Sequence, residues 1–252
     1  MQLRENNILR LEQNIFDVLI VGGGINGAVS AASIAAKGAR VALIDRGDFA
    51  GESSSHSSNL AWGGIKYMES FEFLLVNELC KSRNILAEAY PSTVQEIRFL
   101  TTINKRFRFP AFLVFLGALL YWLIGRCRTR PPRYMTRKRI KALEQCIDVT
   151  DAAAGLEYSD CYLHDNDARF VFNFIRSAMN YGAIAANYVE LTEARRSQDV
   201  WELTAKDEIS GRQVRIRAKT IVNAAGAYVD ELNQIFRRRT NCRHVFSKGV
   251  HL

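Results

Sequence analysis

Hydrophobic and polar positions alternate in blocks along the first fifty residues, and these blocks predict a βαβ unit. Residues 17–21 are apolar and rich in β-branched types, as in a strand that is buried on both faces. A glycine cluster follows, and residues 27–37 then have the spacing of a small-residue helix, which Gly38 ends. Residues 40–44 form a second apolar strand, closed by Asp45. Two strands connected through a helix in this way run parallel.

The later blocks predict further helices and strands. Helical segments are expected at 71–90, 110–125 and 168–181. Residues 184–218 alternate short strands with polar turns, as in a β-meander, and 220–225 form an apolar strand that ends at Gly226. The order predicts an α/β fold: a Rossmann-like domain with a βαβ start, a β-meander and a returning strand, interrupted by a helical insertion.

The basic residues are concentrated in one segment of the chain. The net charge is +8, yet eleven of the 34 Lys and Arg residues lie between Lys105 and Lys141, where there is no Asp or Glu. The five cysteines form no CxxC pair and have no ligand-like spacing with the four histidines, so neither a metal site nor a disulfide framework is predicted. A reducing, cytoplasmic compartment fits this pattern. Residues 1–16 contain no uninterrupted apolar run, and no secretory signal is expected.

The glycine cluster fits the phosphate-binding pattern G-x-G-x-x-G between a strand and a helix. Gly22 permits the tight turn, Gly24 lets a pyrophosphate approach the backbone, and Gly27 lets the helix pack on the sheet. The helix N-terminus, which includes Ile25 and Asn26, offers N–H groups to phosphate. Asp45 follows Gly27 at the distance expected of an acid that binds ribose hydroxyls. The alternative is a glycine turn in some other α/β protein.

A serine-rich loop and a second glycine pair follow the strand that Asp45 closes. Hydroxyls and glycines supply hydrogen bonds and close backbone approach to a polar ligand. The residues concerned are Ser53, Ser54, Ser57, Ser58, Gly63 and Gly64. Alone, this stretch is also compatible with an ordinary flexible loop.

Four dispersed motifs carry a resemblance to a known family. They read DVLIVGGGINGA (17–28), SSSHSSNLAWGGIKYME (53–69), LEYSDCYLHDNDAR (156–169) and IVNAAGAYVD (221–230). In this order they resemble the FAD-dependent glycerol-3-phosphate dehydrogenases, among the D-amino-acid-oxidase-like flavoproteins. The resemblance implies FAD as the cofactor, with Gly63 and Gly64 along its pyrophosphate and flavin and Val189 near the adenine. It also implies that Gly226 closes over the cofactor. Arg46 and Ala225 are further cofactor-binding residues that the resemblance implies.

The resemblance has departures that bear on the substrate. Trp62 and Lys66 stand where the family usually has His and Arg, and Lys offers a point charge where Arg binds phosphate in a bidentate way. Lys66 is expected to bind the anion of the substrate. The closing KGVHL (248–252) resembles a family segment, which makes His251 the expected base, although a frayed terminal residue is the alternative. The chain is expected to be truncated, because the family's remaining substrate-binding strands would follow it.

The apolar segment has basic residues on both sides. Residues 111–124 carry no charge and give a helix of roughly 21 Å, too short to span a bilayer. A helix lying in the membrane interface, with Tyr121 and Trp122 at headgroup depth, is the favoured interpretation over a buried core helix. Nucleic-acid binding is disfavoured because no recognisable module is present.

These predictions combine into one functional hypothesis. We expect an FAD-dependent dehydrogenase for glycerol 3-phosphate or a similar small anionic hydroxy compound, peripheral on the inner face of the membrane, with quinone as electron acceptor. The expected FAD-binding domain comprises 15–100 and 150–236, the insertion 101–149, and the start of a truncated substrate domain 237–252. A flavin oxidase or dehydrogenase for another hydroxy acid or amine, and a non-catalytic chain that binds FAD or membrane, are the alternatives.

Overall fold

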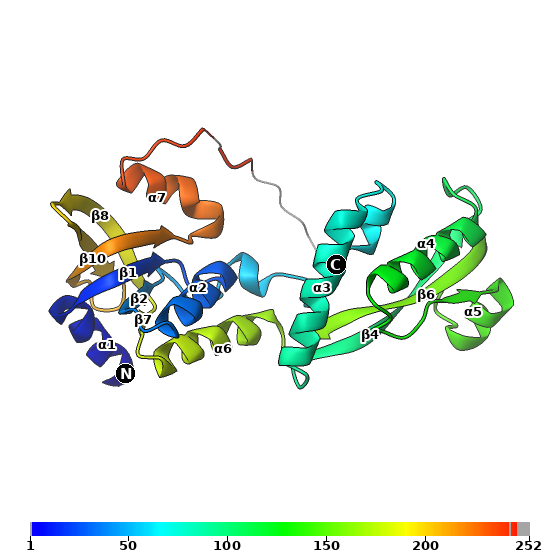
Figure 1. The fold of residues 1–252 in the computed structure, drawn as a ribbon, viewed down its shortest axis with the longest axis horizontal. Coiled ribbons are helices and arrows are strands. Elements are labelled where there is room, and N and C mark those ends of the chain that lie inside the picture. Colours follow the sequence, from blue (N-terminus) through cyan, green and yellow to red (C-terminus); the bar gives the residue numbers. More distant parts are fainter. Residues whose placement is uncertain (1, 242, 246–252) are drawn as a thin grey trace. The chain divides into compact units, whose positions relative to one another are not determined.

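The structure is a computed structural model that describes residues 2–241 and 243–245. It divides the chain into two compact units. Unit 1 comprises Met1–Ser58 and Asn166–Leu252, and unit 2 comprises Asn59–Asp165. The predicted α/β, Rossmann-like fold is confirmed in unit 1 (Figure 1).

A mixed six-stranded sheet forms the centre of unit 1. Its order is β7 (Ile184–Ala186), β2 (Val41–Ile44), β1 (Ile15–Val21), β10 (Gln213–Asn223), β9 (Val200–Asp207) and β8 (Val189–Ser197). The first four are parallel, whereas β8, β9 and β10 form the antiparallel meander predicted from the sequence. β10 belongs to both parts: its first residues pair with β9 and its last residues with β1. The predicted strand at 220–225 is therefore the end of a longer strand.

Helices cover both faces of this sheet, which explains why β1 is apolar at consecutive positions. Leu19 and Val21 face a cluster that includes residues of α1 (Gln2–Gln13), whereas Ile20 faces the cluster of α2 (Ile25–Ala35) and α6 (Asp167–Asn180). The alternation of strand side chains thus buries successive residues in two different cores. A short 3₁₀ turn at Gly226–Tyr228 leads from β10 into α7 (Val229–Ile235).

A long antiparallel pair organises unit 2. β4 (Val94–Asn104) pairs with β6 (Ala152–Leu163) over most of its length, and the short strands β3 (Leu60–Ala61) and β5 (Arg133–Met135) also pair with β6. Because β4 and β6 are far apart in sequence, their pairing encloses all of the chain between them in one unit. This unit begins before and ends after the predicted 101–149 insertion.

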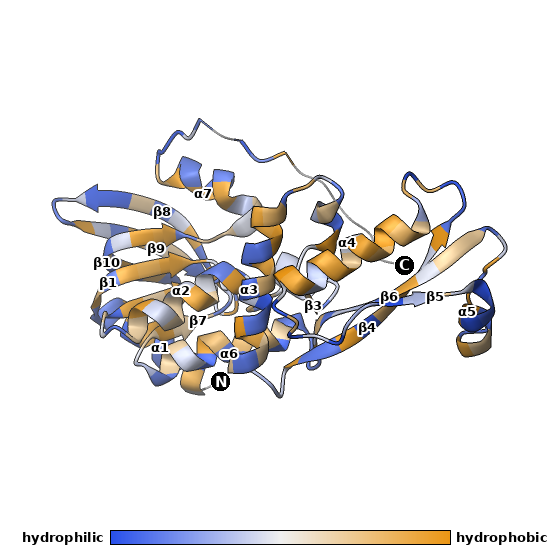
Figure 2. Ribbon diagram, turned by 45° about the vertical axis from the view of Figure 1, so that its right-hand side comes forward, coloured by the Kyte–Doolittle hydropathy of each residue, from blue (hydrophilic) through white to orange (hydrophobic). Residues whose placement is uncertain are grey.

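Three α-helices complete unit 2: α3 (Phe73–Ala89), α4 (Ala111–Ile124) and α5 (Arg137–Leu143). The sequence predicts a basic, proline-containing loop from the end of α4 to about Lys141, but this stretch contains β5 and most of α5, so that expectation is wrong. The local reason is a cap, since Thr136 accepts the N–H of Arg139 at 3.4 Å and so starts the helix. Figure 2 shows α4 as an almost continuously hydrophobic helix. Within the described part of the chain, no helix is long and apolar enough to cross a bilayer.

Candidate nucleotide-cofactor site

A groove of about 620 Å³ lies in unit 1 at the carboxyl ends of β1, β2 and β10. In parallel sheets this edge is where ligands bind, and the volume is in the range of small-molecule and cofactor sites. Nine residues predicted to bind the cofactor line it: Gly22, Gly24, Asp45, Arg46, Ser53, Ser54, Val189, Ala225 and Gly226. Segments distant in the sequence therefore meet where the motifs placed them.

The glycine turn out of β1 has no room for a side chain at Gly22 or at Gly27. Gly22 has a φ of +111°, and a Cβ added there would overlap the carbonyl oxygen of Ala224. A Cβ on Gly27 would overlap the carbonyl oxygen of Gly22 in the same way. The turn therefore packs backbone against backbone, which brings the N-terminus of α2 to the groove. There the N–H of Ile25 donates to Ser54 Oγ at 3.0 Å, linking the serine loop to the start of the helix.

Asp45 connects two turns at the base of the groove. Its carboxylate accepts the N–H of Gly23 at 2.6 Å and the N–H of Gly47 at 2.8 Å. Burial raises the pKa of Asp45 above its ordinary value, and these two hydrogen bonds act in the opposite direction. A carboxylate oxygen has more than one lone pair, so Asp45 retains acceptor capacity toward a ligand.

Aromatic side chains form a rim that the sequence analysis did not identify. The guanidinium of Arg46 lies over the ring of Tyr228, 3.8 Å from its centroid, and the Tyr228 hydroxyl donates to Glu52 at 3.4 Å. Tyr188, with a φ of +53°, donates its hydroxyl to Asp48 at 2.8 Å. Tyr228 stands inside the AGAYVD motif, whereas Tyr188 follows from no motif and comes to the groove through the turn before β8.

Other predicted residues lie near the groove or away from it. Asn26 and Gly27 belong to α2 but do not line the groove. The Ser57 N–H donates to Asp167 at the start of α6, and Ser58 is the last residue of that part of unit 1. Gly63, Gly64 and the exposed Lys66 belong to unit 2. His251 lies outside the described residues.

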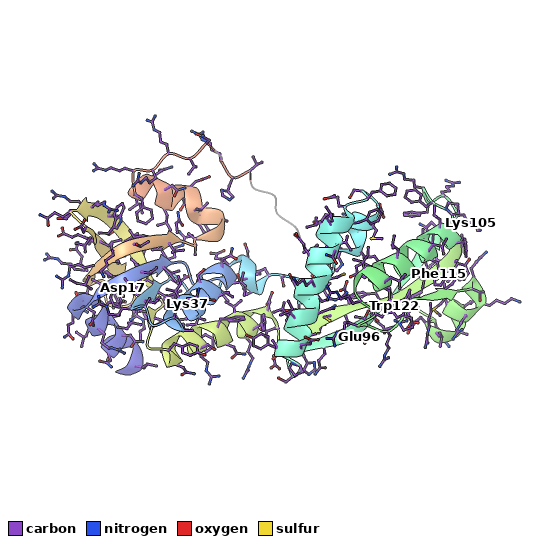
Figure 3. All side chains as sticks on the ribbon, in the orientation of Figure 1. Asp17, Lys37, Glu96, Lys105, Phe115 and Trp122 are labelled. Atoms are coloured by element: carbon purple, nitrogen blue, oxygen red, sulfur yellow. The ribbon has the colours of Figure 1, made fainter. Side chains whose placement is uncertain are left out.

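The basic and apolar segment of unit 2 corrects one expectation. Trp122 and Phe115 project from α4, which the loop containing Lys105 precedes (Figure 3). Tyr121 is 3% exposed and donates to Asp160, so it is not available at headgroup depth as predicted. Its hydroxyl instead donates a hydrogen bond to a buried carboxylate. Trp122 donates its ring N–H to the carbonyl of Thr129 at 2.7 Å.

Comparisons with known proteins agree with the geometry of the groove. The sequence family described as FAD dependent oxidoreductase matches residues 17–252. A D-erythritol 1-phosphate dehydrogenase of Brucella abortus is 34% identical over 96% of this chain and 47% of its own length. A glycerol-3-phosphate dehydrogenase of Pseudomonas aeruginosa is 35% identical over 87% of this chain and 42% of its own. The chain thus spans less than half the length of these curated relatives.

Solved structures give the same result. The glycerol-3-phosphate dehydrogenase of Bacillus halodurans, solved in complex with FAD, superposes with a TM-score of 0.70 at 25% identity. The match covers 93% of this chain and 39% of that protein.

Proposed function

The chain belongs to the family of FAD-dependent oxidoreductases, and on this basis we propose that it supplies the FAD-binding part of a dehydrogenase for a small anionic hydroxy compound. The resemblance inferred from the sequence and FAD as the cofactor are both confirmed. The substrate, the electron acceptor and the activity of the whole protein belong to the proposal.

The observation that carries the proposal is the backbone-packed glycine turn beside the groove. No residue with a side chain fits at Gly22 or Gly27. The groove at this turn has a volume suited to the ADP half of FAD. The N-terminus of α2 would hold the pyrophosphate, and Asp45 would accept ribose hydroxyls. Arg46, Val189, Ala225 and Gly226 would enclose the adenosine. Bound FAD supplies a hydride acceptor, and the protein supplies position and electrostatics.

The substrate proposal rests on the relatives and on two residues singled out from the sequence. Both relatives described above are named for polyol phosphates, glycerol 3-phosphate and D-erythritol 1-phosphate. Lys66 would bind the anionic group, and His251 would take the proton of the substrate hydroxyl. The departure from Arg to Lys at position 66 favours keeping other small hydroxy acids and amines among the substrates to be tested.

We place the protein peripherally on the inner face of the membrane, with quinone as electron acceptor. The support comes from α4, where Phe112, Leu113, Leu116, Leu120 and Leu123 are exposed along one side of an apolar helix. Acid-free basic segments flank this helix, and such segments are attracted to anionic lipid. The exposed side chains are suited to insertion at the interface rather than across the bilayer.

The test uses the full-length protein that contains this chain. We expect it to purify with, or take up, FAD, and to show the visible spectrum of a bound flavin. Under anaerobic conditions, glycerol 3-phosphate or D-erythritol 1-phosphate should bleach that spectrum, whereas lactate and D-alanine should not. Failure to bind added FAD would overturn the proposal as a whole. Bleaching by an amine or hydroxy acid alone would overturn the substrate and favour the alternative oxidoreductase.

A further inference from the structure

The turn between β7 and β8 contains a tyrosine in a backbone conformation that tyrosine rarely adopts. Tyr188 has a φ of +53°, in the left-handed region that favours glycine. For a bulky residue this conformation costs free energy, and it persists only where the surrounding structure holds it. Glycine at this position would avoid the cost, so the side chain needs a reason to be there.

Backbone hydrogen bonds hold the turn on two sides. Tyr188 donates its N–H to the carbonyl of Gly47 at 3.3 Å, and its own carbonyl accepts the N–H of Glu208 at 2.9 Å. The next N–H, that of Val189, donates to the carbonyl of Asp45 at 2.7 Å. The turn is thereby attached to the residues that follow β2 and to those that follow β9, and it lines the groove of unit 1.

A side chain of α1 supports the same turn. Arg4 donates from Nε to the carbonyl of Asn187 at 3.0 Å and from Nη2 to the carbonyl of Tyr188 at 3.2 Å. Its Nη2 also donates to Asp207 at 2.5 Å, and this ion pair fixes the guanidinium. Two consecutive carbonyls therefore receive charge-assisted hydrogen bonds from one side chain, which holds the turn in its left-handed conformation.

The Tyr188 side chain lines the groove and has a fixed orientation there. Its hydroxyl donates to Asp48 at 2.8 Å, and this hydrogen bond raises the pKa of Tyr188, so the phenol stays protonated. Arg46 and Tyr228 line the same groove, with the guanidinium of one over the ring of the other. Aromatic rings of this kind bind nucleotide bases by stacking.

We propose that Tyr188 is a binding residue for the adenine of FAD, with its ring packed against the base, and that Arg4 is the positioning residue that holds it there. This inference rests on the proposed function, because it takes the groove as the site of the ADP half. The glycine turn and Asp45 are assigned to pyrophosphate and ribose, which leaves the base for the aromatic side chain. The backbone strain at Tyr188 is then a cost to the fold that nucleotide binding offsets.

The test compares Tyr188→Gly with Gln198→Gly in the full-length protein. Gln198 also has a φ of +53°, but it lies in the turn between β8 and β9 and does not line the groove. Because glycine tolerates this backbone conformation, neither change should lower the unfolding temperature of the FAD-free protein. Tyr188→Gly should weaken the binding of FAD and of ADP by about tenfold, since a stacked ring is lost. Gln198→Gly should leave both affinities unchanged.

Two further variants separate the ring from its hydroxyl. Tyr188→Phe retains the ring and should bind FAD within about threefold of the wild-type affinity, whereas Tyr188→Leu should show the tenfold loss. Arg4→Met should weaken FAD binding by about fivefold in the wild-type background and leave it unchanged in the Tyr188→Gly background, because contacting residues are energetically coupled.

The outcomes separate the inference from the proposal beneath it. Wild-type affinity in Tyr188→Gly, or equal affinities in the Phe and Leu variants, would overturn the stacking role of Tyr188. An effect of Arg4→Met that is equally large in both backgrounds would make Arg4 merely structural and overturn its positioning role. A wild-type protein that binds no FAD would instead overturn the proposed function, whatever the variants show.

Discussion

At Gly27, one absent carbon atom decides whether α2 can pack on the turn. An alanine Cβ would overlap the carbonyl oxygen of Gly22, and backbone cannot move aside as a flexible side chain can. At Gly24 the nearest atom to such a Cβ is Ser54 Oγ at 3.1 Å, which can rotate. The two glycines of one motif are therefore constrained to different degrees.

We expect Gly27→Ala to lower the free energy of unfolding by about 3 kcal/mol, the upper range for overpacking. The same substitution should weaken FAD binding by at least about 100-fold, a loss that corresponds to a comparable free energy. Gly24→Ala should weaken FAD binding by about tenfold with little loss of stability. Chemical denaturation measures the free energy of unfolding, and fluorescence titration measures the affinity for FAD. Gly117→Ala in α4, where a Cβ has open space, should stabilise by about 0.5–1 kcal/mol; equal effects at all three positions would refute this steric account.

The carboxylate of Asp45 predicts a pH dependence of cofactor binding. Its pKa is raised by burial above the ordinary 3.8, so protonation between 3.8 and the raised value favours the folded chain over the unfolded one. Protonation nevertheless removes an acceptor for ribose hydroxyls. We expect FAD affinity to fall as pH decreases from 7 through the raised pKa of Asp45, while Asp45 itself causes no loss of fold stability down to that pKa.

Asp45→Asn should weaken FAD binding at neutral pH by about tenfold and flatten its pH dependence, since a charge-assisted hydrogen bond becomes a neutral one. Asp48→Asn, which changes an exposed acid of the same groove, serves as the control and should retain the wild-type profile. An unchanged profile in Asp45→Asn would show that another group governs the titration.

Residues of the site were predictable where they stand inside a local sequence motif. Gly22, Gly24 and Asp45 follow from a strand, a turn and a helix that are contiguous in sequence. Tyr188 reaches the groove only because the turn between β7 and β8 passes the carboxyl end of β2, where the N–H of Val189 donates to the carbonyl of Asp45, and no local pattern contains that information. Asp160 stands inside one of the four motifs, but its contacts could not be predicted, because its partners come from two helices that lie far from it along the chain.

At the scale of elements, α1 lacks the apolar pattern that reveals α2. It is polar on most positions, and Ile8 and Leu11 are the apolar side chains that it places in the core of the sheet. A side chain also attaches it: Arg4 donates to Asp207 at 2.5 Å and to the carbonyl of Asn187 at 3.0 Å. Tertiary contacts therefore stabilise a helix whose own sequence does not predict it.

The Arg4–Asp207 pair should make the docking of α1 sensitive to acid. Burial by itself raises the pKa of Asp207, but hydrogen bonds from Arg4, Ser210 and Ile209 lower it to about 2. A depressed pKa means that the contribution to stability is complete above 3.8 and is lost as pH falls toward 2. Arg4→Met should cost about 1–2 kcal/mol at neutral pH and reduce the loss between pH 4 and 2.

Urea denaturation at pH 7, 4 and 2.5 measures this effect. Arg10→Met is the control, because Arg10 lies on an exposed position of the same helix. Equal destabilisation by both substitutions would assign the effect to helix propensity instead of the ion pair.

α4 differs from α1 in the opposite way, because it has more apolar side chains than unit 2 buries. Changing Leu116, Leu120 and Leu123 to Asp should reduce binding to vesicles that contain anionic lipid by at least about 100-fold, since each buried leucine contributes about 1.5–3 kcal/mol. Phe73, Leu74 and Ile85 of α3 are also exposed, and their replacement by Asp gives a charge-matched control. Binding that survives in the α4 variant, or that is lost equally in the control, would sink the membrane proposal.

At the scale of the whole molecule, the division into two units follows from pairings that sequence patterns do not encode. The β4–β6 ladder joins segments about fifty residues apart, whereas the expected boundaries followed changes in composition. Placement of the tryptophans makes this division measurable. Trp201 lies in unit 1, and Trp62 and Trp122 lie in unit 2, so each unit has its own reporter.

Selective stabilisation of unit 1 is therefore the expected sign that the ADP half of FAD binds in the groove. A ligand that binds only the folded state at a hundred times its Kd adds about 2.7 kcal/mol. In a variant that retains Trp201 alone, through Trp62→Phe and Trp122→Phe, both FAD and ADP should raise the unfolding temperature read from the emission maximum. FMN, which lacks the adenosine, should not. With Trp122 alone, through Trp62→Phe and Trp201→Phe, ADP should leave the unfolding temperature of unit 2 unchanged. If a ligand raised the unfolding temperature read at Trp122 but not the one read at Trp201, residues 17–45 would be excluded from the cofactor site, because they belong to unit 1.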